Sequence, residues 1–373
     1  MNKLSRRQAA ARLAGLLTLG WATSAHALVD LLKIPARAST KAPKSLLLGI
    51  TQAGPRLVAV GERGIIVWSD DGGQRWQQAQ VPVSVTLTAV AFADAKRGWA
   101  VGHDGAILHS SDAGQTWALQ FDGLRANAAV LARLEAALQA ATSTEQREQA
   151  ELAVADLKDA TSFGPSRPML SVCVQKSPVG ERLWVAGAFG QLFTSTDGGK
   201  AWVDAAAAIA NPDGLHFNQI TALTDTTLAI ACEAGKVILS RDGGRSWAVR
   251  DTGYNGHLYG VLSGQTTGQG PGPLLAYGFG GHLFASSDDG ATWQATPSPT
   301  KQTLIGGLRL ANGVLLLVDR ERHVLASSDG GKTWSVTQAP AGLPLAGVSS
   351  VPSPGRLAVA GVGGASLIAL NLP

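Results

Sequence analysis

Apolar and polar positions recur along most of the chain in one repeated order. A short apolar run, a glycine-containing turn and a second apolar run come first, as at 57–60, 61–64 and 65–68, and a polar cluster follows. Short apolar runs joined by glycine-rich turns are typical of antiparallel hairpins. The first apolar run returns at 99–101, 183–186, 228–230, 274–277 and 314–317. The pattern therefore predicts a series of similar β-hairpins.

The polar cluster that ends each unit has the form Ser-x-Asp-x-Gly-x-x-Trp. Successive aspartates lie 41, 85, 45, 46 and 41 residues apart, so one period recurs with a single doubled interval. Short polar side chains that bond to turn backbone, a glycine for positive φ and a covering Trp build a folded corner. The pattern resembles the Asp-box (BNR) repeat of β-propellers, and we interpret the boxes as structural turns. Their aspartates are Asp71, Asp112, Asp197, Asp242, Asp288 and Asp329.

A further strand opens each unit and carries a small residue, which suits the crowded inner strand of a radial sheet array. Its seven positions are Gly49, Ala89, Val172, Ala222, Gly260, Gly307 and Gly347. The seventh unit, 345–370, stops where its box and fourth strand are expected, and the apolar segment 28–34 is expected to pair with 366–370 instead. The sequence thus predicts an all-β fold, a seven-bladed β-propeller of four antiparallel strands per blade over 28–373, closed by an N-terminal strand at 28–36.

The doubled interval contains a helical insertion at about 123–166. Leu131, Leu134 and Leu138 lie on one helical face, and Ser143 with Gln146 predicts a capping box that starts a second helix. The insertion connects blade 2 to blade 3, on the side of the ring opposite the Asp boxes. We expect the helical hairpin to stand over the turns between second and third strands.

Those turns carry the most varied charged and aromatic residues of the repeat. Loops of a rigid scaffold are the usual place for binding residues. The candidate partner-binding residues are Glu62, Arg63, His103, Asp104, Phe189, Phe279, Arg320 and Arg322, and Glu233 and Glu321 occupy similar turns.

Composition supports a single exported domain. The 373 residues include 45 glycines, and only 16% are charged. The net charge of +4 comes from residues 1–27, which look like a signal peptide; without them 27 basic and 27 acidic residues remain, which gives no electrostatic case for nucleic acid. General secretory and twin-arginine export both remain open, and the mature chain is expected not to insert into a membrane. The two cysteines, Cys173 and Cys232, are interpreted as unpaired strand residues.

Catalytic alternatives rest on scattered residues. A sialidase-like glycoside hydrolase needs flanking carboxylates or a tyrosine nucleophile, and Glu62, Asp104, Glu233 and Glu321 or the three tyrosines are the available groups. The tyrosines, Tyr254, Tyr259 and Tyr277, lie in no sialidase-like context. The histidines show no metal-ligand spacing, so no metal and no cofactor is expected. A glycan-binding propeller is a further alternative.

Residues 81–92, followed by the Gly-Trp-Ala-Val-Gly-His-Asp-Gly segment at 98–105, resemble the photosystem II stability and assembly factor family and its bacterial relatives. The resemblance implies an exported, non-catalytic seven-bladed propeller that binds a subunit of a membrane complex during assembly. It implies the periplasm, or the thylakoid lumen in a photosynthetic host. The helical hairpin and the absence of a lipoprotein cysteine depart from the family pattern.

Overall fold

The computed structural model describes residues 30–162, 164–177, 180–264, 273–351 and 355–370. The chain divides into a unit Met1–Asp30 and a unit Leu31–Pro373, and the architecture below is that of the second unit. The predicted signal peptide, 1–27, lies outside the described residues.

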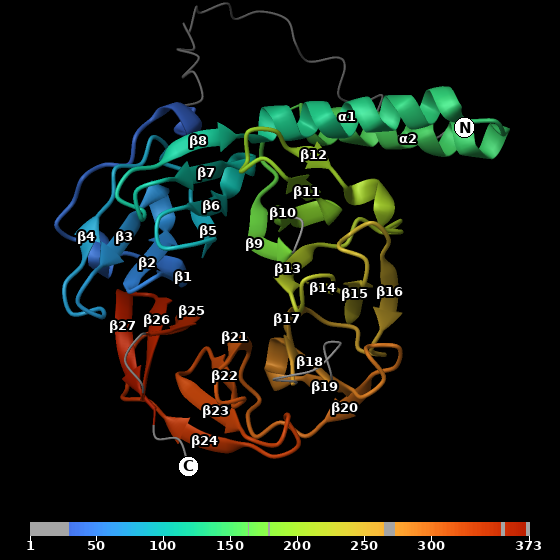
Figure 1. Cartoon of the computed structure of the whole chain (residues 1–373). Coiled ribbons are helices and arrows are strands. Elements are labelled where there is room, and N and C mark those ends of the chain that lie inside the picture. Colours follow the sequence, from blue (N-terminus) through green and yellow to red (C-terminus); the bar gives the residue numbers. More distant parts are fainter. Residues whose placement is uncertain (1–29, 163, 178–179, 265–272, 352–354, 371–373) are drawn as a thin grey trace, which may run out of the picture. The chain divides into compact units, whose positions relative to one another are not determined.

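Antiparallel sheets arranged as the blades of a ring make up this unit (Figure 1). The described strands form seven sheets, and in each one the strands follow one another in chain order. The inner strands of neighbouring blades contact each other around the ring, and β25 of blade 7 contacts β1 of blade 1. The predicted seven-bladed β-propeller is therefore confirmed.

The strands of blades 1 to 4 are β1 (Leu47–Ala53), β2 (Arg56–Gly61), β3 (Ile66–Ser69), β4 (Gln77–Gln78), β5 (Leu87–Phe92), β6 (Gly98–Gly102), β7 (Ile107–Ser110), β8 (Ala118–Phe121), β9 (Met169–Ser177), β10 (Gly180–Gly187), β11 (Leu192–Ser195), β12 (Val203–Asp204), β13 (Phe217–Ala222), β14 (Leu228–Cys232), β15 (Lys236–Ser240) and β16 (Ala248–Asp251). Those of blades 5 to 7 are β17 (Leu258–Ser263), β18 (Leu274–Gly278), β19 (Leu283–Ser286), β20 (Gln294–Thr296), β21 (Leu304–Arg309), β22 (Leu315–Asp319), β23 (His323–Ser327), β24 (Ser335–Gln338), β25 (Leu345–Ser350), β26 (Arg356–Gly361) and β27 (Gly364–Ala369).

The helical elements are α1 (Gly123–Ala140), α2 (Thr144–Ala160) and short 3-10 helices, namely η1 (Leu31–Lys33), η2 (Ala42–Lys44), η3 (Glu62–Gly64), η4 (His103–Gly105), η5 (Ala188–Gly190), η6 (Ala206–Ala208) and η7 (Phe279–Gly281).

The hydrophobic core lies between blades. Each cluster of buried side chains among the described residues joins two neighbouring sheets, as where Trp184 of blade 3 packs with Ile230 of blade 4. The second strands are buried along almost their whole length because both of their faces contact another blade. Since every blade buries its two faces against its neighbours, the hydrophobic core is distributed around the ring and does not form one central cluster.

In each blade the pairing between the first and second strands shifts by one residue near the turn that joins the second strand to the third, and one residue of the inner strand is the first to pair after this shift. That residue is Gly49, Ala89, Ser171, Gln219, Gly260, Gly306 or Gly347. The sequence prediction was therefore wrong in blades 3, 4 and 6, where it chose Val172, Ala222 and Gly307. Residue size alone does not fix a strand register, because the bulge moves every following side chain to the other face.

Blade 7 has three strands within the described part of the chain, so the prediction of four strands in every blade is wrong. The segment expected to complete it does not form the predicted strand: η1 starts at Leu31, and residues 28 and 29 lie outside the described residues. The backbone carbonyl of Leu31 accepts from Ser84 at 2.8 Å, and the N–H of Ala36 donates to Val81 at 2.9 Å. Pro35 has no N–H to donate to a ladder, which disfavours a strand here.

A different contact joins blade 7 to blade 1. The helix η2 packs against β27 on one side and against β3 and β4 on the other. Ala42 in η2 is fully buried, and the backbone of Gly364 lies directly against the carbonyl of Pro43. The N-terminal segment therefore helps to close the ring by packing between two blades.

The insertion folds as two helices at the predicted place in the sequence. Ser143 and Gln146 form the predicted capping box. The helix α1 contacts η4 and β12, and Arg133 pairs with the buried carboxylate of Asp204 at 2.6 Å. Figure 1 shows the two helices along the outer side of blade 3, so the hairpin does not stand over the whole ring of turns as expected. Neither helix of the described residues is long and apolar enough to cross a membrane.

The Asp-box turns connect third to fourth strands and have one geometry. In all six the Ser hydroxyl donates to the Asp carboxylate at 2.7–2.9 Å and accepts from the N–H of the box Gly at 2.7–2.9 Å. The box Gly has positive φ and approaches a side chain of the preceding blade: Gly244 lies against Trp184, and Gly114 lies against Val58. Each box therefore joins its own blade to the one before it.

Candidate functional site

The turns between second and third strands lie on the face opposite the Asp boxes, because successive antiparallel strands reverse direction. We call this face the turn face. In blades 1, 2 and 3 the central turn residue has a left-handed backbone, with φ of 54° at Arg63, 56° at Asp104 and 57° at Phe189. Blade 5 has Gly280 at this position. The backbone is thus repeated while the side chain at its tip changes.

A cavity of about 620 Å³ lies along the inner strands. Its lining comes from all seven blades and mixes apolar residues with polar groups from Thr88, Ser171, Asn218, Gln219 and Tyr259. Arg320 of the turn face is the one charged side chain among its described lining residues. A pocket of this size lined by both apolar and polar groups has the character of a ligand site.

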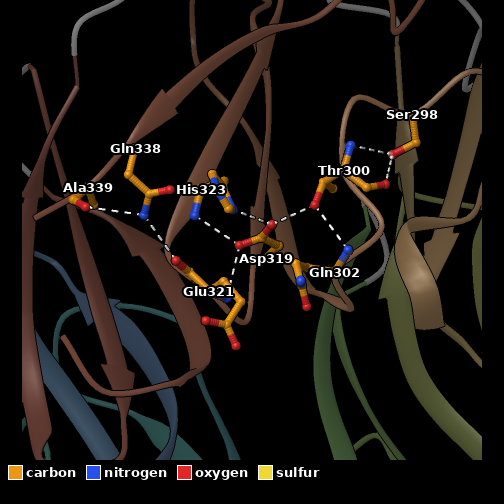
Figure 2. A network of polar contacts seen from close by, with 8 residues as sticks. All are labelled: Ser298, Thr300, Gln302, Asp319, Glu321, His323, Gln338 and Ala339. Carbon is orange, nitrogen blue, oxygen red and sulfur yellow. Dashed lines mark hydrogen bonds and ion pairs between the residues drawn. The ribbon is translucent and has the colours of Figure 1, made fainter. Parts of the chain in front are cut away.

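A buried carboxylate positions the turn that carries Arg320. Figure 2 shows Asp319 at the centre of a polar network, accepting from the Thr300 hydroxyl at 2.9 Å and the His323 N–H at 2.9 Å. The ring Nδ1 of His323 lies 2.7 Å from the same carboxylate, whose side chain is fully buried. Asp319 stands where blade 1 has Gly61. Sequence reasoning missed it, although an acidic residue in place of a turn glycine was a visible signal.

Aromatic and charged residues of blades 3, 4 and 5 meet at one part of the turn face. The Phe189 ring is 4.8 Å from the His216 ring in an edge arrangement, and the Arg167 guanidinium lies 5.1 Å from the Phe189 ring. The ring Nδ1 atoms of His216 and His257 each lie 3.4 Å from the Glu233 carboxylate. Sequence reasoning named Phe189 and Glu233 and missed the other three residues.

Blade 5 adds a second aromatic group. Tyr254 stacks on His282 at 4.4 Å and donates its hydroxyl to the carbonyl of Phe279 at 3.3 Å. Burial raises the pKa of Tyr254 above its ordinary value. The Phe279 side chain itself is 54% exposed, so this predicted residue is available on the surface.

Other predicted residues serve their own loops. The Glu62 carboxylate accepts from the N–H of Leu46 at 3.0 Å, and Arg322 donates to the carbonyl of Pro340 at 3.0 Å. His103 is exposed and Asp104 is half-buried in η4, beside α1. The structure therefore brings Phe189 and Glu233 to the two sides of His216 and places Arg320 at the cavity. Arg322 shares the turn of Arg320, and the other predicted residues lie on blades 1, 2 and 5.

The hydrolase alternative gains no support from this geometry. No carboxylate lines the cavity within the described residues, and Tyr277 is fully buried, whereas Tyr259 does line the cavity. No group of His, Cys, Asp and Glu in the described part of the chain is arranged to hold a metal ion. Both cysteines are free; burial raises the pKa of Cys173 to about 11, which makes that thiol unreactive.

Comparison with known proteins agrees with the resemblance noted in the sequence. A family model described as photosynthesis system II assembly factor YCF48 matches residues 52–141, and a DUF6242 β-propeller domain model matches 272–357. The first match includes 81–92 and 98–105 and confirms the similarity to the photosystem II assembly factor family. No curated protein matches the chain.

Solved structures share the fold. YCF48 bound to a D1 peptide is 15% identical with a TM-score of 0.58, and the match covers 91% of this chain and 100% of that one. YCF48 from Cyanidioschyzon merolae is 14% identical, with a TM-score of 0.55 and coverage of 90% and 98%. The WD40 propeller of Doa1 is 11% identical, with a TM-score of 0.58 and coverage of 92% and 97%.

Proposed function

We propose that this propeller, similar to the photosystem II assembly factor family, is a non-catalytic exported protein that binds a subunit of a membrane complex and assists its assembly or stability. The observation that carries the proposal is the turn face, which presents exposed aromatic and cationic side chains, one of them Arg320 at a cavity that has no carboxylate in its described lining. Exposed aromatic and Arg anchors are typical of protein interfaces.

Two further observations support this proposal. One solved structure with the same fold is of YCF48 with a D1 peptide, so a propeller of this kind accommodates a peptide. Residues 1–27 have the basic start, apolar stretch and small-residue end of an export signal. The client is expected on the exported side of a membrane, in the periplasm or in a thylakoid lumen.

Co-purification from membranes of the native host tests the proposal. Arg63→Glu with Arg320→Glu places negative charges on the turn face, and we expect membrane subunits retained by the tagged wild type to be lost. Arg75→Glu with Arg245→Glu is the matched control, because both arginines are exposed beside Asp boxes on the other face. Equal retention by the two double variants, or loss only in the control, would contradict the assignment of the binding face.

The helical hairpin is tested separately. The backbone of Gly123 lies against Pro165, so residues 124–164 can be replaced by a short Gly-Ser link without separating blades 2 and 3. Asp204→Asn is included, because excision removes Arg133 and would leave a buried carboxylate unpaired. We expect weaker partner retention with an unchanged circular dichroism spectrum; full retention would make the hairpin only a brace.

A further inference from the structure

The turn at Phe189 requires a left-handed backbone but not an aromatic side chain. Its φ is 57°, and its side chain is 55% exposed. A bulky residue with a left-handed backbone is strained, and an exposed aromatic ring gains little from folding. Gly280, at the same position in blade 5, has the same kind of backbone without that strain. The exposed ring of Phe189 is therefore explained better by contact with a binding partner than by the stability of the turn.

Arg167 lies beside this ring without an acidic partner in the described residues. Its guanidinium is 5.1 Å from the Phe189 ring centre, and its side chain belongs to the segment that returns from the helical hairpin to blade 3. Arg167 is half-buried, and this burial lowers the pKa of the guanidinium. A partly desolvated guanidinium keeps its fork of donors for a carboxylate, and such a pair is stronger there than in water.

A continuous path leads from this pair to the cavity. His216 packs its ring against Phe189, and Glu233 lies 3.4 Å from the rings of both His216 and His257. The ring of His257 stacks with that of Tyr259 at 6.2 Å, and Tyr259 lines the cavity. Because Glu233 also accepts the N–H of His216 at 2.8 Å, its charge is held within this path and does not pair with Arg167.

We propose that Arg167, Phe189 and His216 form a shelf that binds an extended acidic segment of the partner protein. The segment's carboxylate pairs with Arg167, an adjacent apolar side chain covers the free part of the Phe189 ring, and the chain continues past His257 toward the cavity. This inference rests on the proposed function and adds the chemistry of the recognised segment.

A phage-displayed library of random twelve-residue peptides, selected on the full exported chain, tests the shelf. The expected result is enrichment of Asp or Glu next to a Phe, Trp or Leu. The enriched peptide, synthesised and titrated by fluorescence anisotropy, should bind Phe189→Gly and Arg167→Gln at least about tenfold more weakly than the wild type. Enrichment without acidic residues, or equal binding to these variants, would overturn the proposal.

Ala234→Gly is the matched control. Ala234 has a φ of 51° in the corresponding turn of blade 4 and presents no ring, so its replacement should leave peptide affinity unchanged. Phe189→Gly should melt no lower than the wild type, because glycine adopts this backbone without strain. A tenfold weaker affinity at an unchanged melting temperature therefore reports a lost contact and excludes misfolding.

The two proposals fail separately. If membrane co-purification finds no partner while the acidic peptide binds through Phe189 and Arg167, the membrane-complex function is wrong and the shelf stands. If a membrane partner is retained equally by wild type, Phe189→Gly and Arg167→Gln, the shelf is wrong and the wider function stands.

Discussion

The two faces of the ring use their side chains in opposite ways. On the Asp-box face the polar side chains are engaged within their own turn, as where the Asp71 carboxylate accepts from Ser69, Gln74 and Arg75. On the turn face the left-handed backbone is repeated, but its tip is Arg63 in one blade and Phe189 in another. The Ser–Asp and Ser–Gly hydrogen bonds that the six boxes share stabilise the ring, whereas the differing tips on a common backbone give the turn face the variety of side chains that binding loops carry.

The comparison is tested most severely at a box glycine. A Cβ at Gly244 would lie 2.2 Å from the buried ring of Trp184, and its φ is 85°. Gly244→Ala should lower the free energy of unfolding by roughly 3 kcal/mol or more, from strain and overpacking together. Chemical denaturation measures this, with Gly243→Ala as control, because its φ is 71° but the nearest atom is 3.9 Å away. Equal losses in Gly244→Ala and Gly243→Ala would mean that the contact with Trp184 of the neighbouring blade does not contribute to the free energy of unfolding.

A smaller loss is expected from one box hydroxyl. Ser195 is buried, donates to Asp197 and accepts from the N–H of Gly199. Ser195→Ala leaves the buried N–H of Gly199 without its acceptor, whereas the exposed Asp197 keeps the N–H of Ala201, and the change should cost about 1–3 kcal/mol in the free energy of unfolding. The exposed Ser162→Ala is the control, and peptide affinity should be unchanged in both. Loss of affinity in folded Ser195→Ala would show that the box face also takes part in binding.

The boxes also predict acid sensitivity. Hydrogen bonds from Thr292, first from its hydroxyl, lower the pKa of Asp288 from 3.8 to about 2. Burial opposes the shift at Asp242, but bonds from Ser246 and Ser240 still lower its pKa to about 2. A carboxyl whose pKa is lowered by folding contributes stability that is present above pH 3.8 and is lost as the pH falls through its folded pKa.

Denaturation midpoints should therefore fall between about pH 4 and pH 2. The double variant Asp242→Asn with Asp288→Asn starts from a lower midpoint at neutral pH and should lose less over that interval, because two titrating groups are gone. A pH profile parallel to that of the wild type would contradict the assigned role of these carboxylates.

The smallest effect is expected at a tip of the turn face. Arg63→Gly removes a strained left-handed residue whose side chain is exposed. Stability should stay the same or rise by up to about 1 kcal/mol, because glycine adopts this backbone freely but also gains freedom in the unfolded chain. Thermal unfolding measures this, with Ala234→Gly for comparison. A loss of more than about 1 kcal/mol would place Arg63 among the residues that stabilise the fold.

What the sequence determined by itself was local. The Ser-x-Asp-x-Gly-x-x-Trp boxes, the glycine turns and the Ser143 capping box depend on hydrogen bonds within a few residues, so their spacing along the chain was enough to predict them. From them followed the number of blades, the opposite placement of the two kinds of turn, and the expectation that Phe189 and Arg320 lie on the turn face. The resemblance of 81–92 and 98–105 to a known family pointed to the same fold.

The tertiary structure alone decided what depends on residues far apart in the chain. Closure of the ring passes through η2 packed between β27 and β3, which no local pattern encodes, because apolar character does not distinguish a strand from a packed segment. Arg167 and His216 contact Phe189 from two different loops, the one before β9 and the one before β13. Asp319 accepts a hydrogen bond from Thr300, which lies in the loop between β20 and β21. Such contacts arise when sheets stack around the ring, since burial and distance between side chains are properties of the assembled blades.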